Sequence, residues 1–379
     1  MINVFIIGSK GIPARYGGFE TFVENLTKRK ANGDIQYFVS CMGQKAERIY
    51  NNAFCFSLPT PFPGPVGRIF HVSNALSWAE SRIANEKGDD KNIIYILGCR
   101  IGPLLKRHVR KLHKLHCFVV CNPDGLEWKR GKWNYFERRI LKFCEKELVL
   151  NSDYIICDSV GIKDYLAREY SKINKAKMSY IAYGCDLDPL RCSSEKYSQW
   201  EKEHRVSSAG FYLFVGRFVP ENNLFLIISE FMKSSTKKDL IIITNVEKDK
   251  YYGRLEKSLR FDRDSRIKFI GTIYDQGLLF SIREKAFAYI HGHSVGGTNP
   301  SLLEALGHTK INLLFDVPFN REVGGDQVLY FTSKTGDLSQ QIELLEATTP
   351  TFHPEVIVKE RFSWPFIVRQ YETFFVNLP

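Results

Sequence analysis

A glycine-rich segment, residues 293–304, has the residue types that hold phosphate groups in proteins. It follows an apolar run over residues 286–290 that reads as a buried strand, so it begins where that strand ends. Its paired glycines leave the backbone bare, and Pro300 suits the first turn of a helix because no N–H is needed there. Unpaired N–H groups and the helix dipole attract anions to such a helix start. The segment therefore predicts a binding site for a nucleotide diphosphate.

Several side chains of this segment are candidate ligands for the nucleotide. Thr298 or Asn299 can cap the helix, and Glu304 lies one turn inside it, where its carboxylate can reach a sugar hydroxyl. Neither His291 nor His293 has a carboxylate partner in the sequence, so we predict no catalytic dyad. The candidates are His293, Gly296, Gly297, Thr298, Asn299, Ser301 and Glu304.

Arg217 is a candidate for the same site, because it directly follows an apolar run over residues 211–215. Its guanidinium can clamp a diphosphate in bidentate geometry and neutralise charge on a leaving group. Alone it reads better as a surface arginine in a loop. The glycine-rich segment later in the chain favours the functional interpretation, and Asn222 in the same loop joins the candidate ligands.

Gly17 and Gly18 form a second possible backbone cradle, between the first apolar run and a helical stretch. Their spacing fits neither the dinucleotide-binding GxGxxG fingerprint nor the GxxxxGK[ST] loop of nucleoside triphosphatases. Glycines between a strand and a helix are often only turns. We include both glycines in the predicted nucleotide site, and the adjacent Arg15 and Tyr16 in the site for the second substrate.

Residues 122–133 combine acidic, basic and aromatic side chains directly after another predicted strand. Asp124 and Glu127 are candidate substrate ligands or a general base, and Trp128 can stack on a sugar ring. Arg130 completes this second candidate group. A helix start with a capping aspartate and solvated charges explains the same residues equally well.

Apolar runs alternate with amphipathic helical stretches along the whole chain, which predicts an α/β protein with parallel sheets. We expect two Rossmann-like, doubly wound domains, residues 1–188 and 205–361, facing across a cleft with ligands at the carboxyl ends of the strands. The predicted strands are residues 4–7, 37–41, 93–97, 117–121, 154–157, 211–215, 240–244, 267–270, 286–290 and 311–315.

The net charge of +11 is concentrated in the first half of the chain. Residues 1–200 carry 31 Lys or Arg and 20 Asp or Glu, whereas residues 201–379 carry 22 of each. Basic side chains fall at helical spacing among the leucines from Leu104 to Leu115, and a basic amphipathic helix of this kind suits an anionic membrane surface, although a merely solvated helix face is equally consistent. Nucleic acid is a weaker partner because no binding motif accompanies the charge. The candidate membrane residues are Arg107, Arg110, Lys111 and Lys114.

Other features of the composition narrow the class of protein. No apolar run approaches the ~20 residues of a membrane span, and the first residues lack a signal peptide. Nine scattered cysteines without CxxC pairs suggest reduced thiols in a cytosolic protein. The clustered histidines of residues 108–116 do not have the pattern of a metal site, and we predict no bound metal.

Taken together, these motifs resemble the retaining GT-B glycosyltransferases of family 4 over nearly the whole chain. The resemblance includes the Gly17-Gly18-Phe-Glu loop, Asp158-Ser159 before a helix, and the segment from Arg217 to Glu304. It implies that the helix over residues 362–379 returns to the first domain, which binds the acceptor, while the second binds the nucleotide sugar. The forms of the Asp124 and Gly296 motifs are similar to a narrower bacterial subgroup, the rhamnosyltransferases of capsule and O-antigen assembly, such as a β-1,4-L-rhamnosyltransferase acting on lipid-linked glucose.

Two positions depart from the wider family. Gly296 stands where a glutamate commonly contacts the transferred sugar, and Asn222 stands where a lysine commonly accompanies the arginine. A degenerate, non-catalytic protein is one interpretation. We favour a changed donor, because a 6-deoxy sugar presents other hydroxyls and backbone N–H groups from Gly296 to Thr298 can bind it.

The resemblance implies a cytoplasmic enzyme on the inner face of the cell membrane that transfers L-rhamnose from dTDP-L-rhamnose to a polyprenyl-diphosphate-linked sugar. Transfer occurs with retention, without a metal or any cofactor beyond the nucleotide sugar. Arg217 stabilises the leaving diphosphate, Glu304 holds the ribose and Asp124 acts on the acceptor side. The alternatives are transfer from UDP-glucose or UDP-N-acetylglucosamine, and a non-catalytic membrane scaffold of the same fold.

Overall fold

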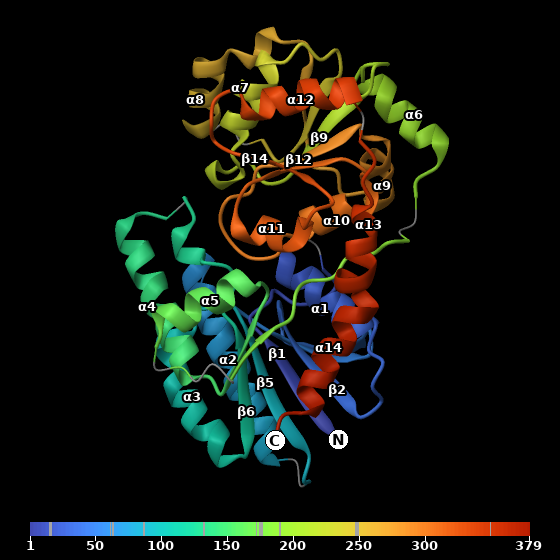
Figure 1. Ribbon diagram of the computed structural model, residues 1–379. Helices are drawn as coiled ribbons and strands as arrows, with labels where there is room; N and C mark the ends of the chain where they lie inside the picture. The colour runs from blue at the N-terminus through green and yellow to red at the C-terminus, as the bar shows by residue number, and fades with distance from the viewer. Residues whose placement is uncertain are drawn as a thin grey trace. The chain divides into compact units, whose positions relative to one another are not determined.

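The computed structural model divides the chain into two compact units (Figure 1). Unit 1 comprises residues 1–184 and 364–379, and unit 2 comprises residues 185–363. The structure describes residues 1–14, 17–60, 62, 64–85, 88–131, 133–171, 173, 177–188, 191–246, 250–348 and 350–379. Among these residues, no helix is both long enough and apolar enough to cross a membrane.

Unit 1 is built on an eight-stranded sheet in the order β3-β4-β2-β1-β5-β6-β7-β8. All neighbouring strands pair in parallel except β3 and β4, which form an antiparallel pair at one edge. The central strands are buried on both faces, as expected of parallel strands covered by helices. The strands are β1 (Ile2–Ile7), β2 (Ile35–Met42), β3 (Ala46–Tyr50), β4 (Ala53–Leu58), β5 (Lys91–Leu97), β6 (Cys117–Asn122), β7 (Tyr154–Cys157) and β8 (Met178–Tyr180).

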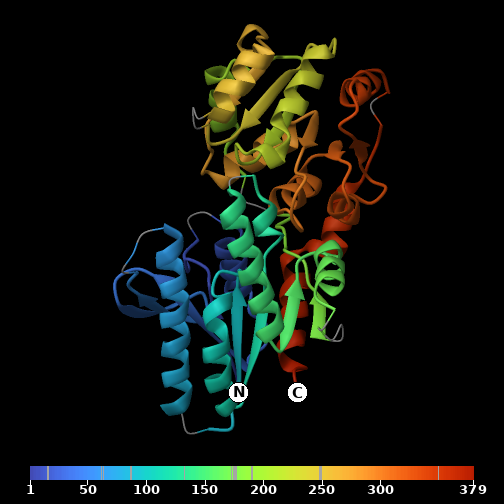
Figure 2. The same ribbon diagram turned by 90° about the vertical axis from the view of Figure 1, so that its left-hand side faces the viewer.

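Two layers of helices cover the sheet of unit 1. Right-handed crossovers place α2 (Gly64–Asn85), α3 (Gly102–Lys114), α4 (Tyr135–Asn151) and α5 (Val160–Glu169) on one face. In Figure 2, α2, α3 and α4 lie side by side in front of the sheet, in agreement with the contacts of α3 with both neighbours. The first helix, α1 (Gly18–Lys28), covers the other face beside α14 (Trp364–Val376). A short 3₁₀ turn, η1 (Glu127–Lys129), precedes α4.

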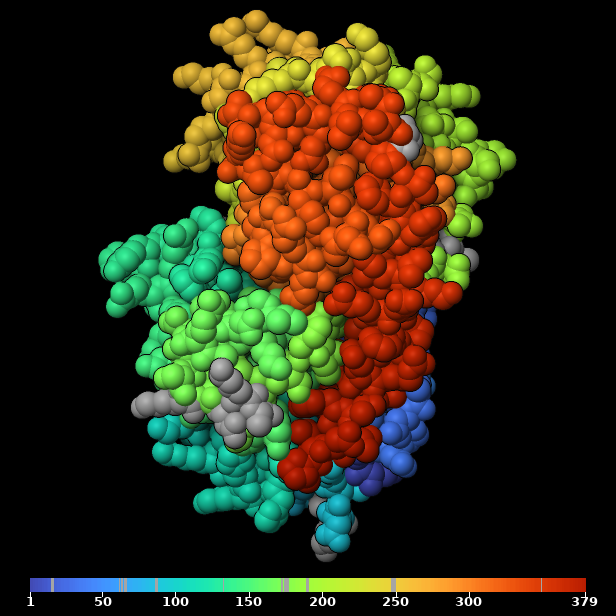
Figure 3. All heavy atoms as spheres, in the orientation of Figure 1, coloured from blue at the N-terminus to red at the C-terminus, as the bar shows by residue number. Residues whose placement is uncertain are grey.

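The C-terminal helix α14 belongs to unit 1 although unit 2 precedes it in the chain. The buried Glu372 carboxylate accepts hydrogen bonds from the N–H groups of Ala31 and Asn32 at 2.9 and 3.0 Å. Tyr371 packs against Phe22 of α1, with ring centroids 4.8 Å apart. In Figure 3 these last residues, in red, form part of the surface of a unit otherwise built from the blue-to-green residues.

Unit 2 has a six-stranded, fully parallel sheet in the order β11-β10-β9-β12-β13-β14. Its strands are β9 (Phe211–Val215), β10 (Asp239–Ile243), β11 (Ile267–Ile270), β12 (Ala288–His291), β13 (Asn312–Phe315) and β14 (Leu329–Phe331). The helical segments are α6 (Ser194–Glu203), η3 (Pro220–Asn222), α7 (Leu224–Lys233), α8 (Lys250–Leu259), η4 (Phe261–Arg263), α9 (Gln276–Lys285), α10 (Pro300–His308), α11 (Pro318–Gly324), α12 (Asp337–Thr348), α13 (Pro354–Ile357) and the π-helical η5 (Val358–Phe362).

The predicted class, an α/β protein with two doubly wound units, is confirmed. Each of the ten predicted strands overlaps an observed strand, while β3, β4, β8 and β14 were not predicted. The unit boundary also differs, because residues 189–204 were left between the predicted domains. There the structure has α6, whose Tyr197 and Trp200 are buried in a core cluster with Phe211 of unit 2. The polar composition of this segment gave no indication that Tyr197 and Trp200 would be buried.

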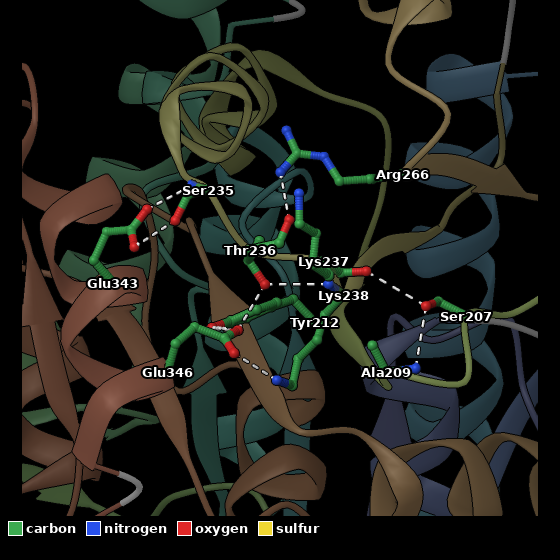
Figure 4. A network of polar contacts seen from close by, with 10 residues as sticks. All are labelled: Ser207, Ala209, Tyr212, Ser235, Thr236, Lys237, Lys238, Arg266, Glu343 and Glu346. Atoms are coloured by element: carbon green, nitrogen blue, oxygen red, sulfur yellow. Dashed lines mark hydrogen bonds and ion pairs between the residues drawn. The ribbon is translucent and has the colours of Figure 1, made fainter.

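A polar network closes the amino-terminal edge of the unit 2 sheet (Figure 4). The Glu346 carboxylate on α12 accepts hydrogen bonds from Tyr212, Thr236 and Lys238 at 3.1, 2.6 and 2.6 Å. Burial alone would raise the pKa of Glu346, but these hydrogen bonds outweigh it and hold the pKa below its usual value. The ionised carboxylate therefore stabilises the folded unit.

Glu346→Gln should lower the free energy of unfolding at pH 7 by about 1–2 kcal/mol, since it removes a charge-assisted hydrogen bond. The folded-state pKa is depressed, so this contribution is present above the ordinary carboxyl pKa and is lost as pH falls through the folded pKa. Urea unfolding should show the largest difference from wild type at neutral pH and a shrinking one below about pH 4. Exposed Glu203→Gln is the control, and a difference independent of pH contradicts the assignment.

Gly102 lets α3 approach α4 closely, because a Cβ there would lie 2.0 Å from the backbone oxygen of Cys144. Gly102→Ala should therefore force the helices apart and lower stability by about 1–3 kcal/mol. Gly253 on α8 has open space around it, so Gly253→Ala should be neutral or stabilise by up to about 1 kcal/mol. Thermal unfolding of both variants checks the contrast, and equal effects would show that the α3–α4 packing is not limited by Gly102.

Candidate functional site

The ends of β9 and β12 meet at the carboxyl edge of the unit 2 sheet, where α10 begins. The carbonyl oxygen of Val215, the last residue of β9, accepts hydrogen bonds from the Ser301 hydroxyl at 2.9 Å and the Tyr289 hydroxyl at 3.1 Å. These bonds tie the start of α10 to the strand that precedes Arg217. The two motifs predicted to share one site are thus adjacent in space.

The loop before α10 has a conformation that its glycine allows. Gly296 has a φ of 133°, a backbone conformation that is strained for any residue with a side chain. Gly297 and Thr298 are buried. Asn299 caps the helix, because its side-chain oxygen accepts a hydrogen bond from the N–H of Ser301 at 3.0 Å. With that N–H occupied and Pro300 lacking one, the amides available to an anion come from the glycine loop itself.

Arg217 is exposed and lies two residues after the end of β9. Its guanidinium makes no hydrogen bond or ion pair with any residue in the described part of the chain, so it can take an anion without losing a partner. Asn222 fixes the surrounding loop: its amide donates to the carbonyl oxygen of Arg217 at 2.7 Å, and its side-chain oxygen lies 2.8 Å from Nδ1 of His293. Asn222 therefore joins the Arg217 loop to the segment after β12.

The Asn222 contact also sets the proton position on a neutral His293 ring. Since the Asn222 amide already donates to Arg217, its oxygen must accept from His293 Nδ1–H, which leaves Nε2 as an acceptor. His291 is fully buried two residues earlier. Burial, and secondly the neighbouring His293, hold the pKa of His291 well below its usual value, so His291 is neutral at pH 7.

Glu304 is anchored by a buried arginine. Nη2 of Arg283, on α9, lies 2.5 Å from Oε2 of Glu304, and the arginine side chain is 1 % exposed while the glutamate is 29 % exposed. Nε and Nη1 of Arg283 have no hydrogen-bond partner among the described residues. Arg283 thus fixes one carboxylate oxygen of Glu304 from the buried side, while the exposed part of the carboxylate remains accessible to a ligand.

In unit 1, the loop after β1 is clamped by carboxylates of α1. Glu20 accepts a hydrogen bond from the N–H of Lys10 at 2.7 Å, and Glu24 accepts one from the N–H of Ala14. Gly17 precedes the helix with a φ of 132°, and a Cβ there would collide with the Glu20 carboxylate. The glycine pair therefore begins α1 as predicted. Predicted residues Arg15 and Tyr16 lie outside the described residues.

Three of the residues predicted on the acceptor side, Asp124, Glu127 and Arg130, form one ion-pair network with Arg100 near the carboxyl ends of β5 and β6. The buried Glu127 pairs with Arg130 at 2.9 Å and with Arg100 at 3.3 Å. Arg130 also lies 3.4 Å from Asp124, which has a φ of 68° and accepts a hydrogen bond from the N–H of Gly125. Glu127 is neutralised by two arginines, so of the two carboxylates Asp124 is the better candidate for contact with a substrate.

Trp128 contacts cations rather than standing free. The ammonium groups of Lys142 and Lys129 lie 4.7 and 5.3 Å from its ring centroid. Lys142 is also within 4.6 Å of the Tyr165 ring and 5.0 Å of the Tyr170 ring. Trp128 was predicted to stack on a sugar ring, but the Lys142 ammonium group already lies close to its ring.

The four cations predicted to face a membrane are exposed along α3. Lys111 pairs with the buried Glu80 at 3.1 Å, whereas Arg107, Arg110 and Lys114 make no ion pair within the described residues. No group of three or more His, Cys, Asp or Glu arranged to hold a metal ion occurs among the described residues.

Three residues of these sites were missed by the sequence argument: Arg283, Arg100 and Lys142. Each lies in a different element from its partner, and no local motif marks it.

Comparison with known proteins shows what this architecture is similar to. A family model described as a domain of unknown function, DUF1972, matches residues 1–186, and no curated protein matches. Among solved structures, HepE of Anabaena in complex with UDP has 14 % identity and a TM-score of 0.74, each chain covered over 100 % of its length.

A second solved structure is similar over the same length. Sucrose-phosphate synthase of Thermosynechococcus elongatus has 14 % identity and a TM-score of 0.78, with 100 % of this chain and 99 % of that one covered. These neighbours are GT-B glycosyltransferases, and the predicted GT-B fold class is confirmed.

Glu304→Gln should destabilise the protein by about 2 kcal/mol or more, because it leaves the Arg283 charge buried and unpaired. Arg283→Met should cost less, since water can still solvate the exposed edge of Glu304. Urea unfolding of both variants and of the double variant measures the asymmetry, and the double variant should recover most of the loss. Exposed Glu360→Gln is the control, and a larger effect of Arg283→Met would contradict this description of the pair.

Proposed function

We propose that this protein is a retaining glycosyltransferase that transfers L-rhamnose from dTDP-L-rhamnose to a polyprenyl-diphosphate-linked sugar in capsular or O-antigen polysaccharide assembly. The observation that carries the proposal is the carboxyl edge of the unit 2 sheet. There the loop with the exposed Arg217, which has no partner among the described residues, adjoins the start of α10, which carries the Gly296–Gly297 backbone before it and the anchored Glu304 one turn inside it. A cation, free amides and a fixed acceptor are what a nucleotide diphosphate requires.

The structural neighbours support a nucleotide-sugar donor. HepE was solved in complex with UDP-glucose as well as with UDP, and that form has a TM-score of 0.72 at 14 % identity over 100 % of both chains. In our proposal the diphosphate contacts Arg217 and the glycine loop, and Glu304 accepts a hydrogen bond from the ribose 3′-hydroxyl.

Gly296 supports the choice of rhamnose among donors. A glutamate commonly occupies this position in the family that the sequence resembles, but a φ of 133° favours glycine here. The loop is therefore shaped to offer backbone N–H groups in place of a carboxylate. A 6-deoxy sugar, which has a methyl group at C5 in place of a hydroxymethyl group, suits such a site.

The proposed transfer proceeds on one face of the sugar. The bond from C1 to the diphosphate oxygen breaks, the acceptor oxygen bonds C1 from the same face, and the acceptor proton passes to the leaving phosphate oxygen. Arg217 and the loop amides stabilise the negative charge that develops on the diphosphate. The route requires no protein nucleophile, no metal and no cofactor beyond the nucleotide sugar.

Unit 1 supplies the acceptor side of the proposal. Asp124 orients the acceptor hydroxyl, since its geometry is fixed by Arg130 and Gly125. The exposed cations of α3 suit a lipid diphosphate at an anionic membrane on the cytoplasmic side. Two alternatives remain as outcomes of the test: transfer of another sugar from UDP-glucose or UDP-N-acetylglucosamine, and a non-catalytic scaffold.

A donor panel tests the function. The full-length protein, given a polyprenyl-diphosphate-linked glucose acceptor, should release dTDP from dTDP-L-rhamnose and show little turnover of UDP-glucose or UDP-N-acetylglucosamine. Arg217→Ala should reduce the rate by about 10²-fold or more, because it removes stabilisation of the leaving group. Arg254→Ala, another exposed arginine of unit 2, is the matched control and should be unchanged.

Turnover confined to UDP-sugars would replace rhamnose with another donor. Absence of transfer with every donor, together with unchanged nucleotide binding in Arg217→Ala, would favour the non-catalytic scaffold.

A further inference from the structure

Helix α4 exposes a stripe of large apolar side chains that the sequence argument did not identify. Phe136 is 75 % exposed, Ile140 61 % and Phe143 52 %, and Leu150 continues the stripe at 38 %. These positions are four, three and seven residues apart, so they lie along one side of the helix over about 20 Å. No other helix of the described residues exposes more than one large apolar side chain. We call these four residues the α4 stripe.

The stripe is held outward by the packing of the helix. Leu141, Cys144 and Leu148 are buried on the opposite side, so α4 cannot rotate the stripe inward without exposing its packed face. Asn134 and Glu137 form a capping box that fixes the helix start, each side chain accepting a hydrogen bond from the other residue's backbone N–H. Exposure of the stripe is therefore a property of a well-formed helix.

Cations border the stripe. Arg139 and Lys146 are exposed on α4, and neither makes an ion pair with a described residue. Arg139 lies over the ring of the exposed Tyr135, 6.0 Å from its centroid. Aromatic and aliphatic side chains beside unpaired cations are the composition of helices that lie in a membrane interface.

The neighbouring helix extends the same surface. Helices α3 and α4 pack together in one layer on one face of the sheet, so their outer sides face the same way (Figure 2). The outer side of α3 carries exposed Lys106, Arg107, Arg110 and Lys114, and Leu104 adds an apolar side chain that is 46 % exposed. One face of unit 1 therefore combines an apolar stripe with a field of positive charge.

The positive charge of the protein is unevenly divided between the two units. Unit 1 contains 30 Lys or Arg and 18 Asp or Glu, whereas unit 2 contains 23 and 24. All of the positive excess thus lies in the unit that carries the stripe. An anionic surface is complementary to it, while a second copy of the same face would bring like charges together.

We propose that the α4 stripe inserts into the interface of an anionic lipid bilayer. Its apolar side chains enter the boundary between headgroups and acyl chains, while the cations of α4 and α3 contact lipid phosphates. This differs from the expectation from sequence, which assigned membrane contact to charge on α3 alone. The inference deepens the proposed function, because a lipid-linked acceptor is reached at such an interface.

Vesicle binding tests the proposal without any sugar donor or acceptor, so it can fail while the transferase proposal stands. Full-length protein should sediment with vesicles of phosphatidylethanolamine and phosphatidylglycerol, and only weakly with phosphatidylcholine. Phe136→Ser combined with Phe143→Ser should lower the partition constant by about tenfold or more, since two apolar rings no longer enter the interface. Unaltered binding of this double variant overturns the proposal.

The matched control is Phe225→Ser combined with Tyr274→Ser, two exposed aromatic side chains of unit 2, which should leave binding unchanged. Thermal unfolding verifies that both double variants fold. A Phe136→Trp variant provides an independent readout: its added fluorescence should be quenched by brominated lipids, whereas that of Phe225→Trp should not. Equal quenching of both variants would contradict insertion through α4.

Two further experimental outcomes would distinguish insertion of the α4 stripe from binding through α3 alone and from dimerisation. If Arg107→Glu with Arg110→Glu abolishes binding while the Phe136 and Phe143 variants retain it, charge on α3 acts alone and the stripe does not insert. If light scattering shows a dimer that Phe136→Ser with Phe143→Ser dissociates, the stripe binds a second copy. A monomer that binds anionic vesicles through both helices is the expected result.

Discussion

The hydrogen bonds that converge on the carbonyl oxygen of Val215 are the interaction on which the candidate donor site depends. Parallel pairing of β9 with β12 brings two strand ends to one edge of the sheet, and the hydroxyls of Ser301 and Tyr289 then fasten the start of α10 to the end of β9. These hydrogen bonds use the hydroxyl groups of Ser301 and Tyr289, which could otherwise contact a ligand. What remains for the ligand is the glycine loop and Arg217, and their relative position is already fixed before anything binds.

Preorganisation by buried ion pairs recurs in both units. Arg283 holds Glu304 from beneath, and Arg100 with Arg130 holds Glu127 beside Asp124. In the first pair the arginine is the more buried partner, and in the second the buried Glu127 fixes Arg130, which also lies beside the more exposed Asp124. Removing a charge from water is expensive, so such pairs contribute less to stability than to geometry. The cost is consistent with sites that must hold a side chain in one orientation before a substrate arrives.

The sequence predicted the sheets well because buried parallel strands read as continuous apolar runs. It failed at β3, whose Ala46–Tyr50 side chains are almost all exposed, since an edge strand paired on one side lacks that signal. In the candidate site, local motifs pointed to Gly296, Arg217 and Glu304 as candidates, but they could not point to Arg283, because its partner lies in another helix. On α4 the spacing of Phe136, Ile140 and Phe143 is typical of a buried face, and only the structure shows that Leu141, Cys144 and Leu148 occupy it instead.

The exposed apolar side chains of α4 are consistent with different roles for the two units. A helix with apolar side chains on both its inner and its outer side is stable in the fold only if the inner side suffices for packing, which the capping box and the close approach at Gly102 allow. The outer side then remains for the proposed contact with a bilayer, and the surplus positive charge of unit 1 is complementary to an anionic surface. In the proposed function, unit 2, whose charge is balanced, contributes Arg217 to the nucleotide site. The proposed function assigns membrane binding to unit 1 and nucleotide binding to unit 2, and this separation of charge suits it, since a basic surface around the nucleotide site would also retain the released diphosphate.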